Sequence, residues 1–147
     1  MNMLNYHQLI NEILVDGYEE NNERTGTGTK ALFERMLKFD LRRGFPILHE
    51  KRVPFKTMLK ELVWFLRGST NATWLQERDC HIWDEWADED GSIGKAYGYQ
   101  LGVKHLYKEG LFDQVDRVIY DLKNNPFSRR ILTNIYVHQD LHEMNLY

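Results

Sequence analysis

Arginines in two segments of the sequence are suited to binding a phosphate group. Arg24 lies in ERTGTGT, where glycines let backbone N–H groups approach an anion and a guanidinium can fork onto its oxygens. Lys30 lacks the preceding glycine spacing of a Walker loop. Arg129 and Arg130 follow Pro126 and precede an expected strand, where an adjacent pair could clamp a phosphate. A plain turn and a solvated arginine pair are the alternatives.

A glutamate on an expected helix is a candidate for proton transfer. The neighbours of Glu61 three and four residues away are Thr57, Met58, Trp64 and Phe65, so Glu61 borders an apolar stripe. A carboxylate partly removed from water holds its proton more readily, which suits it to general acid–base work. The alternative is a half-exposed helix glutamate with no chemical role.

The segment IWDEWADEDG contains two tryptophans, Trp83 and Trp86, among five carboxylates. Two large rings beside acids could stack on a planar heterocycle and hydrogen-bond its ring nitrogens. A calcium loop is excluded because the alternating ligands and the glutamate at the twelfth position are missing. An acidic surface turn beside two core tryptophans is the alternative.

The chain has one cysteine, Cys80, which we interpret as a small packing residue. His81 is its neighbour, but adjacent residues of a strand point to opposite faces, which argues against an activated thiol. His138 and His142 lack the further ligands of a zinc site, so we expect no metal.

The sequence pattern around these residues predicts a mixture of helices and strands, and therefore a mixed α and β fold class. The best-defined helix spans residues 55–67, between Pro54 and Gly68. Its apolar stripe consists of Phe55, Met58, Leu59, Leu62, Val63 and Leu66. Further helices are expected over residues 4–18, 71–78 and 111–122, strands over 37–41, 47–48 and 131–137, and a loop over 22–30. Residues 79–102 show no sustained period.

Composition bounds the class of protein. The 147 residues are 42% hydrophobic and 28% charged, which is typical of a globular domain and not of a disordered chain. A net charge of −3 does not indicate a generic binder of nucleic acid or membrane surfaces. We find no membrane-spanning stretch and no signal peptide, so a cytoplasmic location is expected.

Taken together and in this order, the motifs resemble the thymidylate synthase family, whose folate-dependent members methylate dUMP. They are ERTGTGT, FPIL followed by KR, KELVWFLRGSTN, IWDEWADEDG, GKAYGYQLG and NNPFSRR. The similarity runs from about residue 5 to the end of the chain. The resemblance implies an α+β fold with a mixed β-sheet flanked by helices, and a homodimer.

The resemblance also implies roles at the nucleotide. Arg24 aligns with a phosphate-binding arginine, and Arg129 and Arg130 align with a pair that reaches the phosphate in the partner subunit's site. Glu61 aligns with the glutamate that organises a water network for proton transfer at the pyrimidine. Tyr97 aligns with the tyrosine implicated in removing the C5 proton.

The co-substrate implied by the resemblance is 5,10-methylenetetrahydrofolate. Ile82, Trp83 and Trp86 align with the wall that packs on the folate ring, and Lys51 aligns with a lysine near the folate glutamate tail. A ring as large as that of Trp83 would also help to exclude water, which favours a synthase over a hydroxymethylase. Pro54 stands where many members have histidine, which removes one polar folate contact.

The nucleophilic cysteine of the family belongs to a Pro-Cys pair expected just after the stretch that matches HEMNLY. Residues 1–147 are therefore expected to form the N-terminal part of a single, incomplete domain, inactive by itself. A pyrimidine-nucleotide (dUMP or dCMP) hydroxymethylase of the same fold is the first alternative. A non-catalytic fragment that associates with another subunit is the second.

Overall fold

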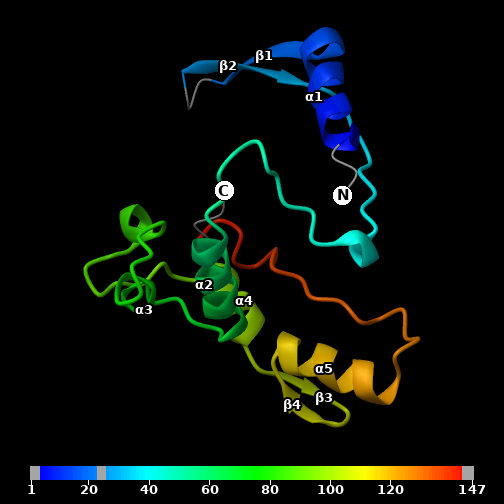
Figure 1. Cartoon of the computed structure of the whole chain (residues 1–147). Coiled ribbons are helices and arrows are strands. Elements are labelled where there is room, and N and C mark those ends of the chain that lie inside the picture. The colour runs from blue at the N-terminus through cyan, green and yellow to red at the C-terminus, as the bar shows by residue number, and fades with distance from the viewer. Residues whose placement is uncertain (1–3, 23–25, 144–147) are drawn as a thin grey trace. The chain divides into compact units, whose positions relative to one another are not determined.

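The computed structural model describes residues 4–22 and 26–143, which belong to two compact units, Met1–Val53 and Pro54–Tyr147 (Figure 1). The first unit contains α1 (Leu4–Asp16), β1 (Tyr18–Asn22), β2 (Thr27–Ala31) and the 3-10 helix Leu41–Arg43. The second contains α2 (Phe55–Leu66), α3 (Thr73–Gln76), the 3-10 helix Asp84–Trp86, α4 (Tyr97–Gly102), β3 (His105–Tyr107), β4 (Gly110–Phe112) and α5 (Gln114–Asn124).

The mixed helix and strand content agrees with the predicted α+β class. The strands of the described residues form two antiparallel hairpins, β1–β2 and β3–β4, and no mixed sheet joins them there. None of the helices in the described ranges is long and apolar enough to cross a membrane.

In the first unit, α1 contacts an antiparallel hairpin. The predicted helix is confirmed and ends at Asp16, and Lys30 of β2 donates a hydrogen bond of 3.0 Å to the carbonyl of Leu14. The loop predicted over residues 22–30 is wrong in its second half, because Thr27–Ala31 pair with β1. Threonine favours extended backbone, and pairing with the neighbouring strand compensates for the weak strand preference of the glycine between the threonines.

The strand predicted over residues 37–41 is wrong. Asp40 accepts a hydrogen bond of 3.1 Å from the backbone N–H of Arg42, and this contact starts a 3-10 helix instead. The alternating side chains find no buried face, since Leu41 is 69% exposed. Alternation alone does not make a strand where no partner strand supplies the hydrogen bonds. Residues 47–48 form no strand either.

In the second unit, α2 confirms the helix predicted over residues 55–67, with Pro54 at its N-cap. Among the described residues, the apolar stripe is not the face that α2 buries most completely. The fully buried residue of α2 is Trp64, whereas most of the predicted stripe is partly exposed. The exposed members are Phe55, Leu59, Leu62, Val63 and Leu66. The aromatic side of the helix therefore faces the core of this unit.

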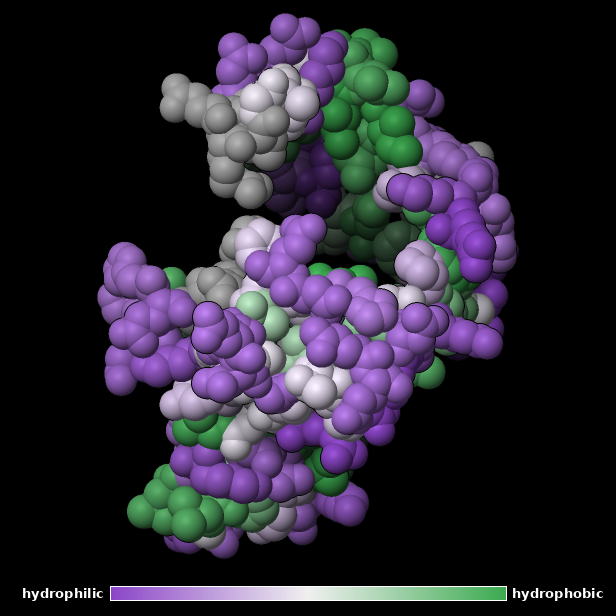
Figure 2. All heavy atoms as spheres, turned by 90° about the vertical axis from the view of Figure 1, so that its left-hand side faces the viewer, coloured by the Kyte–Doolittle hydropathy of each residue, from purple (hydrophilic) through white to green (hydrophobic). Residues whose placement is uncertain are grey.

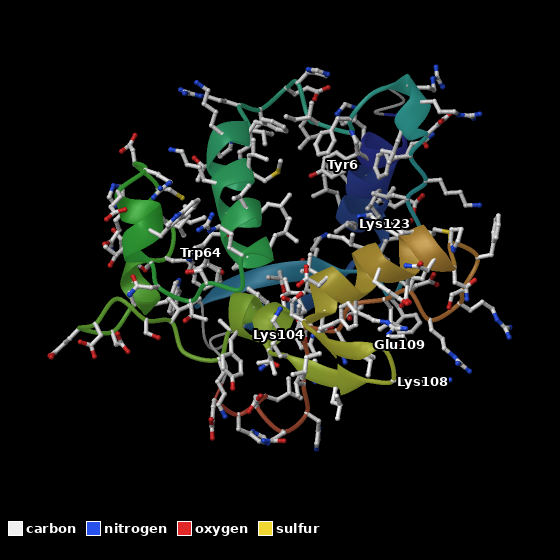
Figure 3. The ribbon with its side chains drawn as sticks, turned by 90° about the horizontal axis from the view of Figure 1, so that it is seen from below. Tyr6, Trp64, Lys104, Lys108, Glu109 and Lys123 are labelled. Carbon is white, nitrogen blue, oxygen red and sulfur yellow. The ribbon has the colours of Figure 1, made fainter. Side chains whose placement is uncertain are left out.

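The core of the second unit forms around Trp64, which lies on the side of α2 toward α3 (Figure 3). Its ring N–H donates a hydrogen bond of 3.0 Å to the carbonyl of Asn71, so the buried indole is satisfied. The side chain of Asn71 accepts from the backbone N–H of Thr73 at 2.8 Å, which confirms the short helix α3. The buried cluster comprises Trp64, Ala72, Leu75, Cys80, Trp83, Ile93 and Ala96.

Glycines bring α4 against the end of α2. A Cβ at Gly98 would lie 2.0 Å from the carbonyl oxygen of Ser69, and one at Gly102 would lie 2.8 Å from the Cα of Gly68. These backbones approach to a distance that side chains forbid. Sequence period did not predict α4, because the helix has six residues and its N-cap, Ala96, makes no side-chain hydrogen bond.

A hairpin and a helix complete the second unit. The helix predicted over residues 111–122 is correct from Gln114 onward, whereas its first residues form β4. Asp113 separates the two elements, since its side chain accepts from the backbone N–H of Asp116 at 2.8 Å. Arg117 of α5 lies 4.6 Å from the ring centroid of Tyr107 in β3, so α5 packs on the hairpin (Figure 1).

The strand predicted over residues 131–137 is not formed, although its β-branched residues favour extended backbone. The side chain of Gln114 pairs with this segment instead. Its oxygen accepts from the backbone N–H of Asn134 at 2.7 Å, and its nitrogen donates to the Asn134 carbonyl at 2.9 Å. One amide side chain therefore takes the place of a neighbouring strand at that residue.

The C-terminal segment runs back from α5 toward α4 (Figure 1). There its Asp140 accepts a hydrogen bond from Gln100 of α4. Asp140 is 7% exposed and accepts hydrogen bonds from Lys95 at 2.7 Å and from Gln100 at 3.0 Å. The Lys95 ammonium, followed by the Gln100 amide, holds the pKa of the Asp140 carboxyl below its ordinary value.

Gly98→Ala is expected to destabilise the second unit, because the new methyl group collides with the Ser69 carbonyl. Overpacking of this kind lowers the free energy of unfolding by about 1–3 kcal/mol. Urea denaturation measures this change. Gly28→Ala is the matched control, since its Cβ would meet only the Asn21 side chain at 3.8 Å. Equal stability of the two variants would contradict the close approach of α2 and α4.

Acid is expected to weaken the Asp140 contacts. A carboxyl whose pKa is lowered by folding stabilises the fold above its ordinary pKa, and this contribution is lost as the pH falls through the lowered value. The melting temperature should therefore differ most between the wild type and Asp140→Asn near pH 7. The difference should begin to shrink at about pH 4, the ordinary pKa of the group, and should vanish only below its lowered pKa. A constant difference from neutral to acid pH would contradict this account.

Candidate active site

Glu61 and Trp83 are joined by a hydrogen bond, although they lie 22 residues apart. The indole Nε1 donates to Oε1 of the carboxylate at 2.8 Å. Glu61 is half-buried on α2, while Trp83 is 7% exposed and precedes the 3-10 helix Asp84–Trp86. Oε2 of Glu61 accepts no hydrogen bond from a described residue, so it is available to water or to a ligand.

Three aromatic rings surround this pair. Trp83 lies 6.0 Å from Trp64 and 6.0 Å from Tyr97 between ring centroids. Phe65 contacts Tyr97 edge-on at 5.2 Å and Trp83 at 6.0 Å. Edge-to-face contacts at these separations are favourable and fix the ring planes. We call Glu61, Phe65, Trp83 and Tyr97 the carboxylate–aromatic cluster.

The structure thus brings together three residues that the sequence analysis assigned to catalysis, Glu61, Trp83 and Tyr97. Their chemical roles stay predictions. Helical spacing identified Phe65 only as a neighbour of Glu61, yet its ring contacts both Trp83 and Tyr97. Its position four residues after Glu61 on α2 was the available signal.

Ile82 and Trp86, predicted to contact folate, lie on the surface beside the buried Trp83. Their exposed fractions are 47% and 36%. Asp84, between them, accepts hydrogen bonds from Gln76 at 2.9 Å and from the ring of His81 at 2.8 Å. The Gln76 amide, followed by His81, lowers the pKa of the Asp84 carboxyl. These contacts fix the turn that presents Ile82 and Trp86.

Residues 82–91, which include this turn, contain five carboxylates. The face of the molecule that carries α3 is covered mainly by hydrophilic residues (Figure 2). Among the described residues, no group of three or more histidine, cysteine or acidic side chains is arranged to hold a metal ion. His138 and His142 are exposed and lie in turns rather than on one helix.

The predicted arginine pair lies just after α5. Arg129 and Arg130 are exposed, in a turn where the backbone N–H of Arg130 donates to Ser128 Oγ at 3.1 Å. Neither guanidinium forms an ion pair with a described residue. Arg130 lines a pocket of about 540 Å³ together with Tyr107, Arg117 and others. No hydrogen bond or ion pair within the described ranges links this pair to the carboxylate–aromatic cluster.

Two further candidates belong to the first unit. Lys51 is exposed there. Arg24 lies outside the described residues. The phosphate role of Arg24 and the folate role of Lys51 therefore stay predictions.

Chemically, the cluster offers a carboxylate with one fixed and one available oxygen, beside a buried wall of rings. Such a site can order a water molecule or a polar edge of a heterocycle and keep bulk solvent away. A phenol ring on the same wall adds a second group able to exchange a proton.

Comparisons with known proteins identify the family of the chain. The sequence model of the family described as thymidylate synthase matches residues 4–147. A thymidylate synthase of Pseudomonas fluorescens (strain SBW25) is 45% identical over 130 residues, which cover 88% of this chain and 47% of the relative. The solved structure of thermostable thymidylate synthase A from Bacillus subtilis matches with a TM-score of 0.86 and 36% identity, covering 96% of this chain and 54% of that one.

The structural match shows that the chain has part of an α+β fold that is found in an enzyme. It belongs to the thymidylate synthase family. The chain spans about half the length of the relatives that it matches.

Trp83→Phe should destabilise the second unit, because it leaves a half-buried carboxylate oxygen without its donor. Loss of a hydrogen bond to a charged group costs about 1–3 kcal/mol of the free energy of unfolding. In a Glu61→Met background the same substitution should cost less, since no acceptor is present. Urea denaturation of the four proteins in this cycle gives the coupling, and zero coupling would contradict the hydrogen bond.

Proposed function

We propose that the complete protein containing these 147 residues is a thymidylate synthase, a methyltransferase that converts dUMP to dTMP. The observation that carries the proposal is the Glu61–Trp83 hydrogen bond inside a wall of rings that includes Tyr97. Family membership supports the same reaction. The co-substrate is 5,10-methylenetetrahydrofolate, which leaves as dihydrofolate.

The reaction needs C5 of uracil to become a nucleophile. Addition of a thiolate to C6 gives an enolate-like intermediate, whose C5 attacks the methylene carbon of the folate. Loss of the C5 proton and of the tetrahydrofolate leaves an exocyclic methylene, which accepts a hydride from tetrahydrofolate. The thiolate then leaves, so dTMP and dihydrofolate are the products. Cys80 is unsuited to this attack, because it is 2% exposed in the hydrophobic core.

The carboxylate–aromatic cluster supplies the proton chemistry in this proposal. Glu61 orders water at the pyrimidine through its available oxygen, and Tyr97 assists removal of the C5 proton. Trp83 contributes by keeping solvent from the exocyclic methylene, whose capture by water would give a hydroxymethyl product. Its burial to 7% exposure supports this role.

The outer residues bind the ends of the two substrates. Ile82 and Trp86 offer exposed apolar surface to the folate ring, and Lys51 pairs with the glutamate tail. Arg24 binds the dUMP phosphate. The guanidinium groups of Arg129 and Arg130, which form no ion pair with a described residue, reach the phosphate of the partner subunit in a homodimer. No nucleic acid, membrane or metal is required. A cytoplasmic location and a single domain that includes residues 1–147 complete the proposal.

The test is an assay of the complete gene product with dUMP and 5,10-methylenetetrahydrofolate. We expect dihydrofolate formation, which raises the absorbance at long ultraviolet wavelengths. Glu61→Gln and Tyr97→Phe should each lower kcat by about a hundredfold or more, as expected for loss of a group that acts in proton transfer. The matched control, Glu77→Gln, alters an exposed carboxylate of the same unit and should leave kcat unchanged.

The products distinguish this proposal from its alternatives. Formation of tetrahydrofolate and a hydroxymethylated nucleotide would indicate a hydroxymethylase instead. Absence of turnover by the complete protein, combined with binding to another subunit, would indicate a non-catalytic role. Residues 1–147 purified by themselves should form no dTMP, because their single thiol is buried.

A further inference from the structure

One buried carboxylate connects both ends of the helical turn that carries Tyr97. Asp140 accepts from Lys95, two residues before Tyr97, and from Gln100, three residues after it. The two contacts use different oxygens, Oδ1 at 2.7 Å and Oδ2 at 3.0 Å. We propose that Asp140 is a positioning residue that fixes the orientation of the Tyr97 ring for the reaction. This inference rests on the function proposed above.

The helix that carries Tyr97 needs such support. α4 has six residues, which is far below the length at which a helix is stable by itself in water. Its N-cap, Ala96, provides no side-chain hydrogen bond to the first turn. The position of Tyr97, the first residue of α4, is therefore fixed by contacts with other segments.

The contacts of Asp140 are suited to fixing this turn. Gln100 is 3% exposed and also donates to the carbonyl of Lys95 at 3.3 Å, so the carboxylate and the amide close the turn together. Lys95 makes a second ion pair with Glu143 at 3.0 Å. Gln114 of α5 donates to the Gln100 carbonyl at 2.6 Å, which adds a neighbouring helix to the network.

A shift of this turn would reach the carboxylate–aromatic cluster directly. The Tyr97 ring contacts Phe65 and Trp83 edge-on, and Trp83 donates to Glu61. Edge-to-face geometry changes when a ring tilts or slides. A displacement of about 1 Å in a reacting group can cost a hundredfold in rate. Among the described residues Asp140 forms its hydrogen bonds with Lys95 and Gln100 and not with these aromatic residues, so its effect would be transmitted through the turn and α4.

The experiment compares two buried aspartates in the complete protein. Asp140 is 7% and Asp121 is 9% exposed, and each pairs with one cation, Lys95 at 2.7 Å and Arg117 at 2.9 Å. Asp121 belongs to α5, where it pairs with Arg117, and among the described residues it forms no hydrogen bond with the turn that carries Tyr97, so Asp121→Asn is the matched control. The rate measured is release of tritium from dUMP labelled at C5, which reports proton removal.

We expect Asp140→Asn to lower kcat for tritium release by about tenfold to a hundredfold, with the KM for dUMP changed less than about twofold. Asp121→Asn should leave kcat within about twofold of the wild type at a temperature where both variants are folded. Lys95→Met should resemble Asp140→Asn, and Lys95→Arg, which keeps the charge, should recover most of the rate. Equal kcat values for the two aspartate variants would overturn the proposal.

A second measurement tests the placement of the ring without turnover. Asp140→Asn should change the near-ultraviolet circular dichroism of the tryptophan and tyrosine bands, because Tyr97 and Trp83 pack on each other. Asp121→Asn should leave these bands unchanged. An inactive wild type with the expected spectral change would refute the proposed function alone. An unchanged spectrum in Asp140→Asn would refute the positioning role, whatever the activity.

Discussion

Two helices can contribute a carboxylate and a phenol to one cluster only if their backbones approach closely. In this chain the approach depends on glycines, since a side chain at Gly98 would occupy the space of the Ser69 carbonyl oxygen. The absence of a Cβ there lets α4 lie against the end of α2. Phe65 can then contact Tyr97, and Trp83 can fill the space between them and Glu61. The geometry of the candidate site thus follows from a steric constraint outside it.

In the second unit, side-chain hydrogen bonds hold neighbouring segments together in the way that backbone hydrogen bonds do in a β-sheet. The segment 131–137 has no neighbouring strand among the described residues, and the amide of Gln114 pairs with it at Asn134. The Asp140 carboxylate connects the following turn to α4. Such links are directional and few, so each one carries more of the tertiary arrangement than a single rung of a sheet.

The sequence predicted the elements whose signals are local. α2 begins after Pro54 and repeats its apolar residues at helical spacing, and both features can be read within one window. The buried face of α2 could not be read this way, because the stripe is apolar on one side and Trp64 lies on another. The strand expected over 37–41 failed because pairing requires a partner that no local pattern reveals.

The same distinction applies to the candidate site. Helical spacing made Glu61 a candidate, residue type made Trp83 one, and the family resemblance added Tyr97 and the roles of all three. That Glu61 bonds to Trp83, rather than lying beside only its helical neighbour Trp64, is a tertiary contact across 22 residues. Asp140 gave no signal at all in the sequence, since its role arises from two partners 40 and 45 residues away.

The hydrogen bond from Trp83 has a consequence for the direction in which protons can move. An indole N–H donates and has no lone pair with which to receive a proton, so Trp83 cannot itself take a proton from Glu61. The bond occupies one lone pair of Oε1, and the other lone pairs of the two carboxylate oxygens are left for other partners. Trp83 therefore orients the carboxylate without competing for its proton, and the proton exchange of Glu61 depends on the groups that lie beside the remaining lone pairs.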